Sequence, residues 1–383
     1  MAASPASRST EPLSARTERR YKIAAIPGDG IGVDLVPGVT ELVDEAAERH
    51  EVGIDWLRLD WSSTRFRARG QFMPDDWLSV LAGTDAVFLG AVGDPAVPDH
   101  ISLWGLLLPI RRGLRQSVNV RPIVSLPGIL GPLRDPRPFD FVVVRENNEG
   151  EYTNIGGSLY EDTLDEVVVQ SSVFTRRGTE RVVRYAFDLA RSRRCDLVSA
   201  TKSNGLVHSM PFWDKVAREV ARDCPDVKFR ELHIDALVAR LALAPSDFDV
   251  IVASNLFGDI LSDLGAALMG GIGLAASANV NPTADAPSMF EPVHGSAPDI
   301  FGQGIANPTG QVLSACLMMI HLGELDVARD IDDALRRALA DPLGRTPDVG
   351  GRASTVQVIE RIRLELHKQR AAPGARPTLR RSS

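Results

Sequence analysis

The chain has 383 residues, of which 44% are hydrophobic and 24% charged, and its formal net charge is −7. This length exceeds one ordinary core and favours two domains, and the composition is that of a globular protein. No apolar run approaches the length of a membrane helix, and the spacing of the three cysteines matches no metal or redox motif. We therefore expect a cytoplasmic protein with reduced thiols that acts away from membranes.

Charge is distributed unevenly along the chain. Residues 1–20 carry a net charge of +2 and residues 368–383 carry +5. Because the whole chain carries −7, the segment between these two ends carries −14. Both ends are rich in Ser, Pro, Ala and Arg and have no apolar periodicity, so we expect disordered tails. The acidic body argues against nucleic acid as a partner.

The first predicted elements are a strand over 21–26 and a helix over 33–49, joined by the glycine-rich sequence "IPGDGIG". Gly28 and Gly30 fit the first two positions of the dinucleotide-binding fingerprint, but its last glycine position is occupied by Val33. The acidic residue expected about 20 positions later is also missing. This loop therefore fails as a Rossmann fingerprint.

Strand and helix patterns then alternate along the chain. Strand-like runs lie at 52–59, 85–89, 139–144, 165–174, 195–200, 227–234 and 248–253, and amphipathic helices at 181–194 and 212–223. The segment from about 308 to 366 has a helical pattern. This alternation predicts an α/β protein with a large, mostly central sheet.

Three carboxylates follow predicted strands. Asp259 and Asp263, in "NLFGDILSDLG", are four residues apart and share one face of a helix, and Asp235 stands at another strand-to-helix junction. Carboxylates without a Cys or His cluster favour a hard divalent cation, Mg²⁺ or Mn²⁺. The alternative is a helix-capping Asp259 and a solvated Asp263.

Arginines form a second group. Arg111 and Arg121 lie ten residues apart, and Arg145 ends an apolar strand, at the edge where α/β sheets bind ligands. Guanidinium groups bind carboxylates in a bidentate manner, so the set indicates a substrate with more than one carboxylate; the alternative is three ordinary surface arginines. Tyr152 and Lys202 also follow strands and could relay and accept protons.

The loop over 290–308, "FEPVHGSAPDIFGQGIANP", is rich in Gly and Pro and carries His294, Asp299 and Asn307. A loop of this kind can wrap an adenosine. A carboxylate such as that of Asp299 could accept hydrogen bonds from ribose hydroxyls and repel a 2′-phosphate.

Together these motifs resemble the decarboxylating β-hydroxyacid dehydrogenases, the family of the isocitrate and 3-isopropylmalate enzymes. The resemblance covers residues 21–366 and includes "PGDGIG", the three arginines, "TKSN", "NLFGDILSD" and "FEPVHGSAPDI…GIANP" in that order. The stretches "DHISLWGLLLPIRR", "RENNEGEYTNIGG", "SSVFTRRG" and "IDALVARLAL" look most like the tartrate dehydrogenase/decarboxylase and D-malate dehydrogenase branch. Pro109 and "RRGLRQ" depart from the usual pattern of that branch, which leaves the substrate open.

The resemblance implies a two-domain fold around a large mixed sheet that is not a Rossmann fold. Residues 21–116 plus 270–367 would form a discontinuous NAD-binding domain. Residues 117–269 would form the domain that binds substrate and metal and carries the dimer contact.

The resemblance also implies roles for single residues. It assigns Arg111, Arg121 and Arg145 to the substrate carboxylates, Asp235, Asp259 and Asp263 to Mg²⁺ or Mn²⁺, and Ile31, Asn204, Glu291, His294, Gly295, Ala297, Asp299 and Asn307 to the cofactor. Lys202 would take the C2 hydroxyl proton, and Tyr152 would protonate the enolate left after CO₂ loss. In this family the Lys202 and Asp235 positions reach into the partner subunit's site, which implies a homodimer. Asp299 followed by Ile300 predicts NAD rather than NADP.

The implied activity is NAD- and metal-dependent oxidative decarboxylation of an (R)-2-hydroxy dicarboxylic acid, D-malate or tartrate, with K⁺ as an open further requirement. One alternative is 3-isopropylmalate dehydrogenase, an enzyme of leucine biosynthesis. Another is a non-catalytic regulatory subunit, but such subunits are expected to lose metal carboxylates or the Lys202 and Tyr152 pair, all of which are present here.

Overall fold

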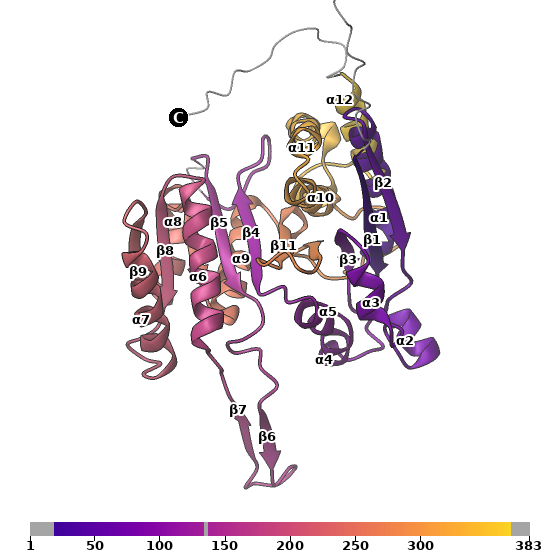
Figure 1. Ribbon diagram of the computed structural model, residues 1–383. Coiled ribbons are helices and arrows are strands. Elements are labelled where there is room, and N and C mark those ends of the chain that lie inside the picture. Colours follow the sequence, from indigo (N-terminus) through magenta and orange to yellow (C-terminus); the bar gives the residue numbers. More distant parts are fainter. Residues whose placement is uncertain (1–18, 134–136, 369–383) are drawn as a thin grey trace, which may run out of the picture.

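A ten-stranded mixed sheet runs through the molecule in the computed structural model, which describes residues 19–133 and 137–368 (Figure 1). The strand order is β2-β1-β3-β12-β11-β4-β5-β10-β8-β9. This confirms the predicted α/β class with a large mixed sheet. Within the described ranges, no helix has the length and apolar character needed to cross a membrane.

One half of the sheet is built from both ends of the chain. Its strands are β1 (Arg19–Gly28), β2 (Val52–Arg58), β3 (Ala86–Ala91), β11 (Ala276–Val280) and β12 (Ser288–Pro292). Its larger helices are α1 (Ile31–Glu48), α10 (Thr309–His321), α11 (Leu325–Ala340) and α12 (Thr355–Lys368), which confirms the helical end of the chain. Short helices α2 (Ser63–Arg69), α3 (Trp77–Ala82), α4 (Asp99–Ser102) and α5 (Leu108–Gly113) complete this half, with a π-helical turn over Leu103–Leu107.

The other half comes from the middle of the chain. Its strands are β4 (Val118–Val124), β5 (Asp140–Glu146), β8 (Asp196–Thr201), β9 (Lys228–His233) and β10 (Val250–Ala253). Its helices are α6 (Arg176–Arg191), α7 (Ser209–Arg222), α8 (Ile234–Leu243) and α9 (Asn255–Met269). The consecutive valines of β5 are buried on both faces of the sheet, as their uninterrupted apolar run predicts.

The two halves meet where β11 pairs antiparallel with β4. Strands from 21–116 and 270–367 lie on one side of this junction and those from 117–269 on the other. The division into two domains with separate roles stays a prediction.

Most predicted elements differ from the structure by a few residues at their ends, as for α6, which is predicted over 181–194, and two differ in a way that matters for the fold. β1 begins at Arg19, inside the predicted N-terminal tail, because Arg19 and Arg20 pair with Val52 and Gly53 of β2; Arg19 also forms an ion pair with Glu324. The rest of that tail lies outside the described residues. The run at 165–174 is not a strand of the central sheet: β7 (Val167–Gln170) pairs with β6 (Gly156–Leu159) in a separate hairpin that projects from the body (Figure 1).

Candidate active site

A cavity of about 200 Å³ opens beside the junction of the two sheet halves. It is lined by Leu103, Leu108, Arg111, Arg121, Arg145, Asn147, Tyr152, Asn255 and Asp259. The three predicted substrate arginines therefore meet in one place, together with the predicted proton donor Tyr152 and one predicted metal carboxylate. We call this group of nine residues the arginine cavity.

The sheet and α9 position the charged groups of the arginine cavity. Arg121 and Arg145 come from the neighbouring strands β4 and β5, and α9 begins directly after β10, so that Asp259 lies in its second turn. A Cβ at Gly258 would lie 2.6 Å from the Cβ of Arg145. Glycine at this position therefore allows α9 to approach β5 closely enough for Asp259 to reach both arginines.

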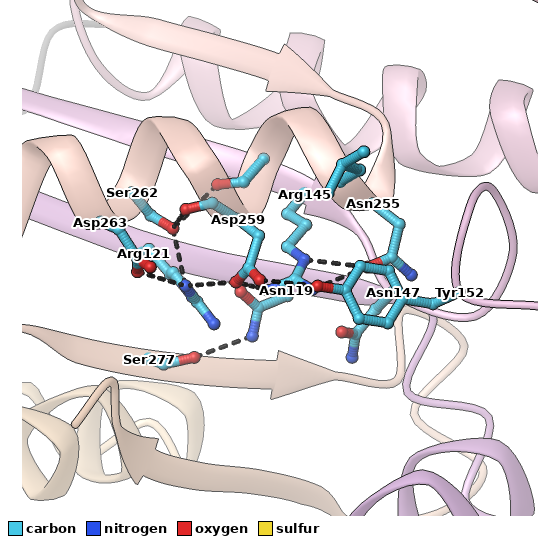
Figure 2. A network of polar contacts seen from close by, with 12 residues as sticks. Asn119, Arg121, Arg145, Asn147, Tyr152, Asn255, Asp259, Ser262, Asp263 and Ser277 are labelled. Carbon is cyan, nitrogen blue, oxygen red and sulfur yellow. Dashed lines mark hydrogen bonds and ion pairs between the residues drawn. The ribbon is translucent and has the colours of Figure 1, made fainter. Parts of the chain in front are cut away.

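Asp259 is the centre of the polar network in Figure 2. Its Oδ1 atom forms an ion pair with Arg145 and lies 3.2 Å from Nη1 of Arg121, and its Oδ2 accepts a hydrogen bond of 3.0 Å from the Tyr152 hydroxyl. Burial opposes the charge, but Arg145 and Arg121 outweigh it and lower the pKa of Asp259. Asp259 is therefore an ionised carboxylate at neutral pH.

Arg145 and Arg121 are held in fixed positions. Both are buried, and Oδ1 of Asn255 accepts bonds of 3.1 and 2.7 Å from Nε and Nη2 of Arg145. Burial, and next the charge of Arg121, lower the pKa of Arg145 to about 10, which leaves it protonated at neutral pH. Arg121 donates a bond of 2.6 Å to Ser262. Two cations fixed side by side suit an anionic ligand.

Arg111 reaches the cavity from α5. Its Nη2 atom lies 2.6 Å from Oε1 of Glu291 on β12, and both side chains are buried. Glu291 is predicted to contact the cofactor and Arg111 to bind the substrate. The structure therefore pairs one predicted substrate-binding residue with one predicted cofactor-binding residue.

The predicted metal carboxylates are only partly assembled. Asp263 lies one turn after Asp259 on α9, and burial together with the Asp259 charge raises the pKa of Asp263. Its oxygen is 3.7 Å from Nη1 of Arg121. In the part of the chain that the structure describes, no three His, Cys, Asp or Glu side chains come close enough to hold a metal ion. Oxygen ligands fit Mg²⁺ or Mn²⁺, but this chain brings only two of the three carboxylates together.

The third carboxylate, Asp235, pairs instead with Lys202. Nζ of Lys202 lies 3.0 Å from Oδ1 of Asp235, and this bond lowers the pKa of Asp235. Neither residue lines the arginine cavity, and their side chains are 32% and 68% exposed. Asn204 is exposed on the same turn after β8. Lys202 and Asp235 thus form a second, partly exposed group, which we call the lysine pair, and Asn204 lies near Lys202 in the sequence.

The glycine-rich loop before α1 packs against the predicted adenosine loop. The backbone N–H of Ile31 donates a bond of 2.9 Å to the carbonyl of Ser296. A Cβ on Gly30, which has φ +52°, would lie 2.1 Å from that carbonyl oxygen. Ile31 is buried and shares an apolar cluster with Ala297. Glycine at position 30 therefore allows close contact with a loop more than 260 residues downstream.

The remaining predicted cofactor residues lie on or after this loop. His294 is buried, its Nδ1 lies 2.9 Å from the Gly295 carbonyl, and its Nε2 has no hydrogen-bond partner among the residues that the structure describes. An unpaired buried nitrogen fits a site that receives a polar ligand. Asp299 and Gly295 are exposed, whereas Asn307 is buried and donates to Asp348 at 3.0 Å.

Three residues of this region escaped the sequence reasoning. Asn147 and Asn255 line the cavity, and Glu151 accepts bonds from Ser254 Oγ at 3.1 Å and from the Leu256 N–H at 3.0 Å, at the start of α9. All three lie within "RENNEGEYTNIGG" or "NLFGDILSD", the stretches that carry the resemblance. The motifs therefore contain these three residues, although their residue types alone do not identify them as part of the site.

A comparison with protein families matches residues 22–362 to the model described as "Isocitrate/isopropylmalate dehydrogenase". The chain is 50% identical over 354 residues to the "Probable tartrate dehydrogenase/decarboxylase" of Bacillus subtilis (strain 168), covering 92% of this chain and 99% of the relative. It is 49% identical over 353 residues to the "D-malate dehydrogenase [decarboxylating]" of Escherichia coli (strain K12), covering 90% and 98%.

A third relative and a solved structure also match this chain over most of its length. The "Tartrate dehydrogenase/decarboxylase" of Pseudomonas putida is 50% identical over 349 residues, with 88% of this chain and 95% of the relative covered. The crystal structure of isocitrate dehydrogenase from Methylococcus capsulatus matches with a TM-score of 0.81 and 35% identity, over 90% of this chain and 99% of that chain.

Proposed function

This chain belongs to the isocitrate/isopropylmalate dehydrogenase family, and from that premise we propose that its substrate is D-malate or tartrate and its cofactors are NAD and Mg²⁺ or Mn²⁺. It is an enzyme, and its relatives' names support oxidative decarboxylation of hydroxy dicarboxylates. A non-catalytic role is therefore set aside.

The observation that carries the proposal is the convergence of Arg111, Arg121 and Arg145 on one small cavity. Three guanidinium groups are suited to an acid with two carboxylates. A volume of about 200 Å³ lies below the usual range for ligand pockets and favours a four-carbon acid.

A second candidate, 3-isopropylmalate, is favoured by one specific feature. Leu103 and Leu108 give the arginine cavity an apolar wall, and such a wall could cover an alkyl group on the substrate. The small volume weighs against this larger acid.

The proposed proton transfers use groups of this chain. Burial, and next the Asp259 charge, raise the pKa of Tyr152, so its hydroxyl keeps its proton at neutral pH and can deliver it to the carbon left by CO₂. Lys202 takes the C2 hydroxyl proton. When bound, the nicotinamide would accept a hydride and the divalent ion would polarise the C2 oxygen. Asp259 and Asp263 would hold the ion, with Asp235 as the third ligand.

We assign Lys202 and Asp235 to the arginine cavity of the partner subunit in a homodimer. Two features support this. The lysine pair does not line the cavity of its own chain. The projecting β6–β7 hairpin exposes apolar side chains, among them Leu159 at 63% and Val168 at 67%, which suits burial against a second copy (Figure 1).

The preference for NAD over NADP rests on Asp299. Its carboxylate is exposed on the loop that follows His294. A carboxylate there would accept hydrogen bonds from ribose hydroxyls and repel a 2′-phosphate.

A substrate panel tests the proposal. NADH formation is followed with D-malate, tartrate and 3-isopropylmalate, each with Mg²⁺ or Mn²⁺, with and without K⁺, and with NAD or NADP. We expect the highest kcat/KM with D-malate or tartrate and NAD, and none after chelation of the metal. A far higher kcat/KM for 3-isopropylmalate would replace the substrate assignment.

A further inference from the structure

A row of buried asparagines crosses the junction between the two sheet halves behind the arginine cavity. Asn279 on β11 lies opposite Asn119 on β4, and both are fully buried. Oδ1 of Asn279 accepts bonds of 2.9 Å from Nδ2 of Asn119 and 2.9 Å from Nδ2 of Asn147. Asn119 also donates to Ser277 at 2.8 Å (Figure 2). Asn279 therefore receives two donors from the opposite half of the sheet.

The other end of the Asn279 amide faces Glu291. Nδ2 of Asn279 donates a bond of 2.7 Å to Oε1 of Glu291, the same oxygen that binds Arg111 at 2.6 Å. Asn279 thus lies between Asn147, which lines the arginine cavity, and Glu291.

The direction of this amide is fixed by its neighbours. The backbone carbonyl of Gln116 can only accept a hydrogen bond, so Asn147 must turn its NH₂ group toward it. The same NH₂ group also donates to Asn279. Glu291, paired with a guanidinium, also acts as an acceptor, so Asn279 must turn its own NH₂ toward it. One orientation satisfies both ends.

Arg111 has two alternative partners. It pairs with Glu291 in this structure, and under the proposed function it binds a substrate carboxylate. When Arg111 turns to the substrate, a buried Glu291 carboxylate without another donor would be costly. The N–H of Asn279 is already in place on the same oxygen.

We propose that Asn279 is a positioning residue that keeps the Glu291 carboxylate hydrogen-bonded while Arg111 passes to the substrate carboxylate. The inference rests on the proposed function of Arg111 and adds a residue to it. Without this donor, Glu291 retains Arg111 more firmly, and the substrate binds more weakly.

Asn279→Leu tests this role because it removes the donor toward Glu291, keeps the branched shape and adds no charge, while Asn119 and Asn147 keep their other acceptors, Ser277 and the backbone carbonyl of Gln116. We expect the KM for D-malate or tartrate, and the Kd of that acid measured by calorimetry without NAD, to rise on the order of tenfold. The kcat should change less than the KM. Asn279→Ala serves as a second variant if the leucine variant does not fold.

The matched control is Asn281→Leu. Asn281 is also a buried asparagine, two residues along the chain, but it donates to the Leu114 carbonyl and to Asp285 at 3.1 and 2.8 Å. It should lose thermal stability to a similar extent and keep the wild-type KM within about twofold.

A double-mutant cycle separates positioning from general destabilisation. In a Glu291→Gln background, the neutral amide no longer retains Arg111, so Asn279→Leu should change the Kd by less than about twofold. An equal rise in both backgrounds, or an equal rise in the Asn281 control, overturns the proposal. A wild-type chain that is inactive and binds neither acid overturns the proposed function and this inference with it, whereas an active wild type with unaltered Asn279 variants overturns the inference alone.

Discussion

The arginine cavity and the lysine pair differ in burial and in support. Arg121 and Arg145 are buried, lie on adjacent central strands and have several partners each. Lys202 and Asp235 follow β8 and β9 at the far end of the sheet, and the ion pair between them is partly exposed. The arginines of the cavity are therefore held in fixed positions, whereas the lysine pair is partly exposed.

Under the proposed function, this difference corresponds to separate roles for the two chains of a homodimer. Groups that hold the substrate carboxylates need fixed geometry, which buried strands provide. Groups that complete the site from a partner subunit must reach the surface of their own chain. On this account one chain binds the acid, and the other supplies the base and the third metal ligand.

The largest expected effect comes from Lys202→Met. Removing the proposed base should lower kcat on the order of 10³-fold, with little change in thermal stability. Steady-state kinetics and thermal unfolding give both values. Lys228→Met is the matched control, because Lys228 forms a similar exposed ion pair with Asp196 at 3.0 Å. Near-normal turnover of the Lys202 variant would contradict the assignment of the base.

A smaller loss is expected for Tyr152→Phe on the cavity side. It removes the proposed proton donor but leaves the arginines, so kcat should fall on the order of 10²-fold while the acid still binds. Kinetics and calorimetry separate the two effects. Tyr185→Phe alters another partly buried tyrosine, on α6, and should keep wild-type rates. Equal rates for the Tyr152 variant and the wild type would exclude Tyr152 as the donor.

The preference for NAD over NADP can be altered without a substitution in the arginine cavity or in the lysine pair. Asp299→Lys combined with Ile300→Tyr replaces a charge that repels a 2′-phosphate with one that attracts it. The ratio of kcat/KM for NAD over NADP should fall at least about tenfold. Measuring both cofactors at saturating substrate gives the ratio, and an unchanged ratio would mean that this loop does not recognise the ribose.

The smallest effect concerns stability beside the cavity. Burial raises the pKa of Glu146 from 4.5 to about 7. The stability linked to this group is fully present below pH 4.5 and is lost as the pH rises through about 7, because the folded state binds the proton more tightly. Relative to Glu146→Gln, the wild type should lose on the order of 1–3 kcal/mol between about pH 5 and pH 8. Urea unfolding at both values measures this, and a difference that does not vary with pH would contradict it.

Much of the fold and of the cavity could be predicted from the sequence. The apolar run of β5 and the four-residue spacing of Asp259 and Asp263 identify a buried strand and a helix face. Strands β4 and β11 escaped prediction because polar residues such as Asn119 and Asn279 interrupt their apolar pattern. These residues are buried by contacts across the sheet, and no local pattern reports such contacts.

The placement of the lysine pair could be inferred only from the resemblance. Spacing along the chain does not state whether Lys202 faces the arginines of its own chain or of another. The role of Asn279 has no sequence signal either, since it depends on the distances to Glu291 and Asn147.

Subunit complementation tests the shared site most directly. Lys202→Met and Tyr152→Phe chains are unfolded and refolded together in equal amounts. If each site combines Tyr152 of one chain with Lys202 of the other, half of the dimers are mixed and each contains one intact site, so activity should recover to about a quarter of wild type. If both residues serve a site within one chain, every site in the mixture carries one substitution, and the activity would stay at the level of the separate variants.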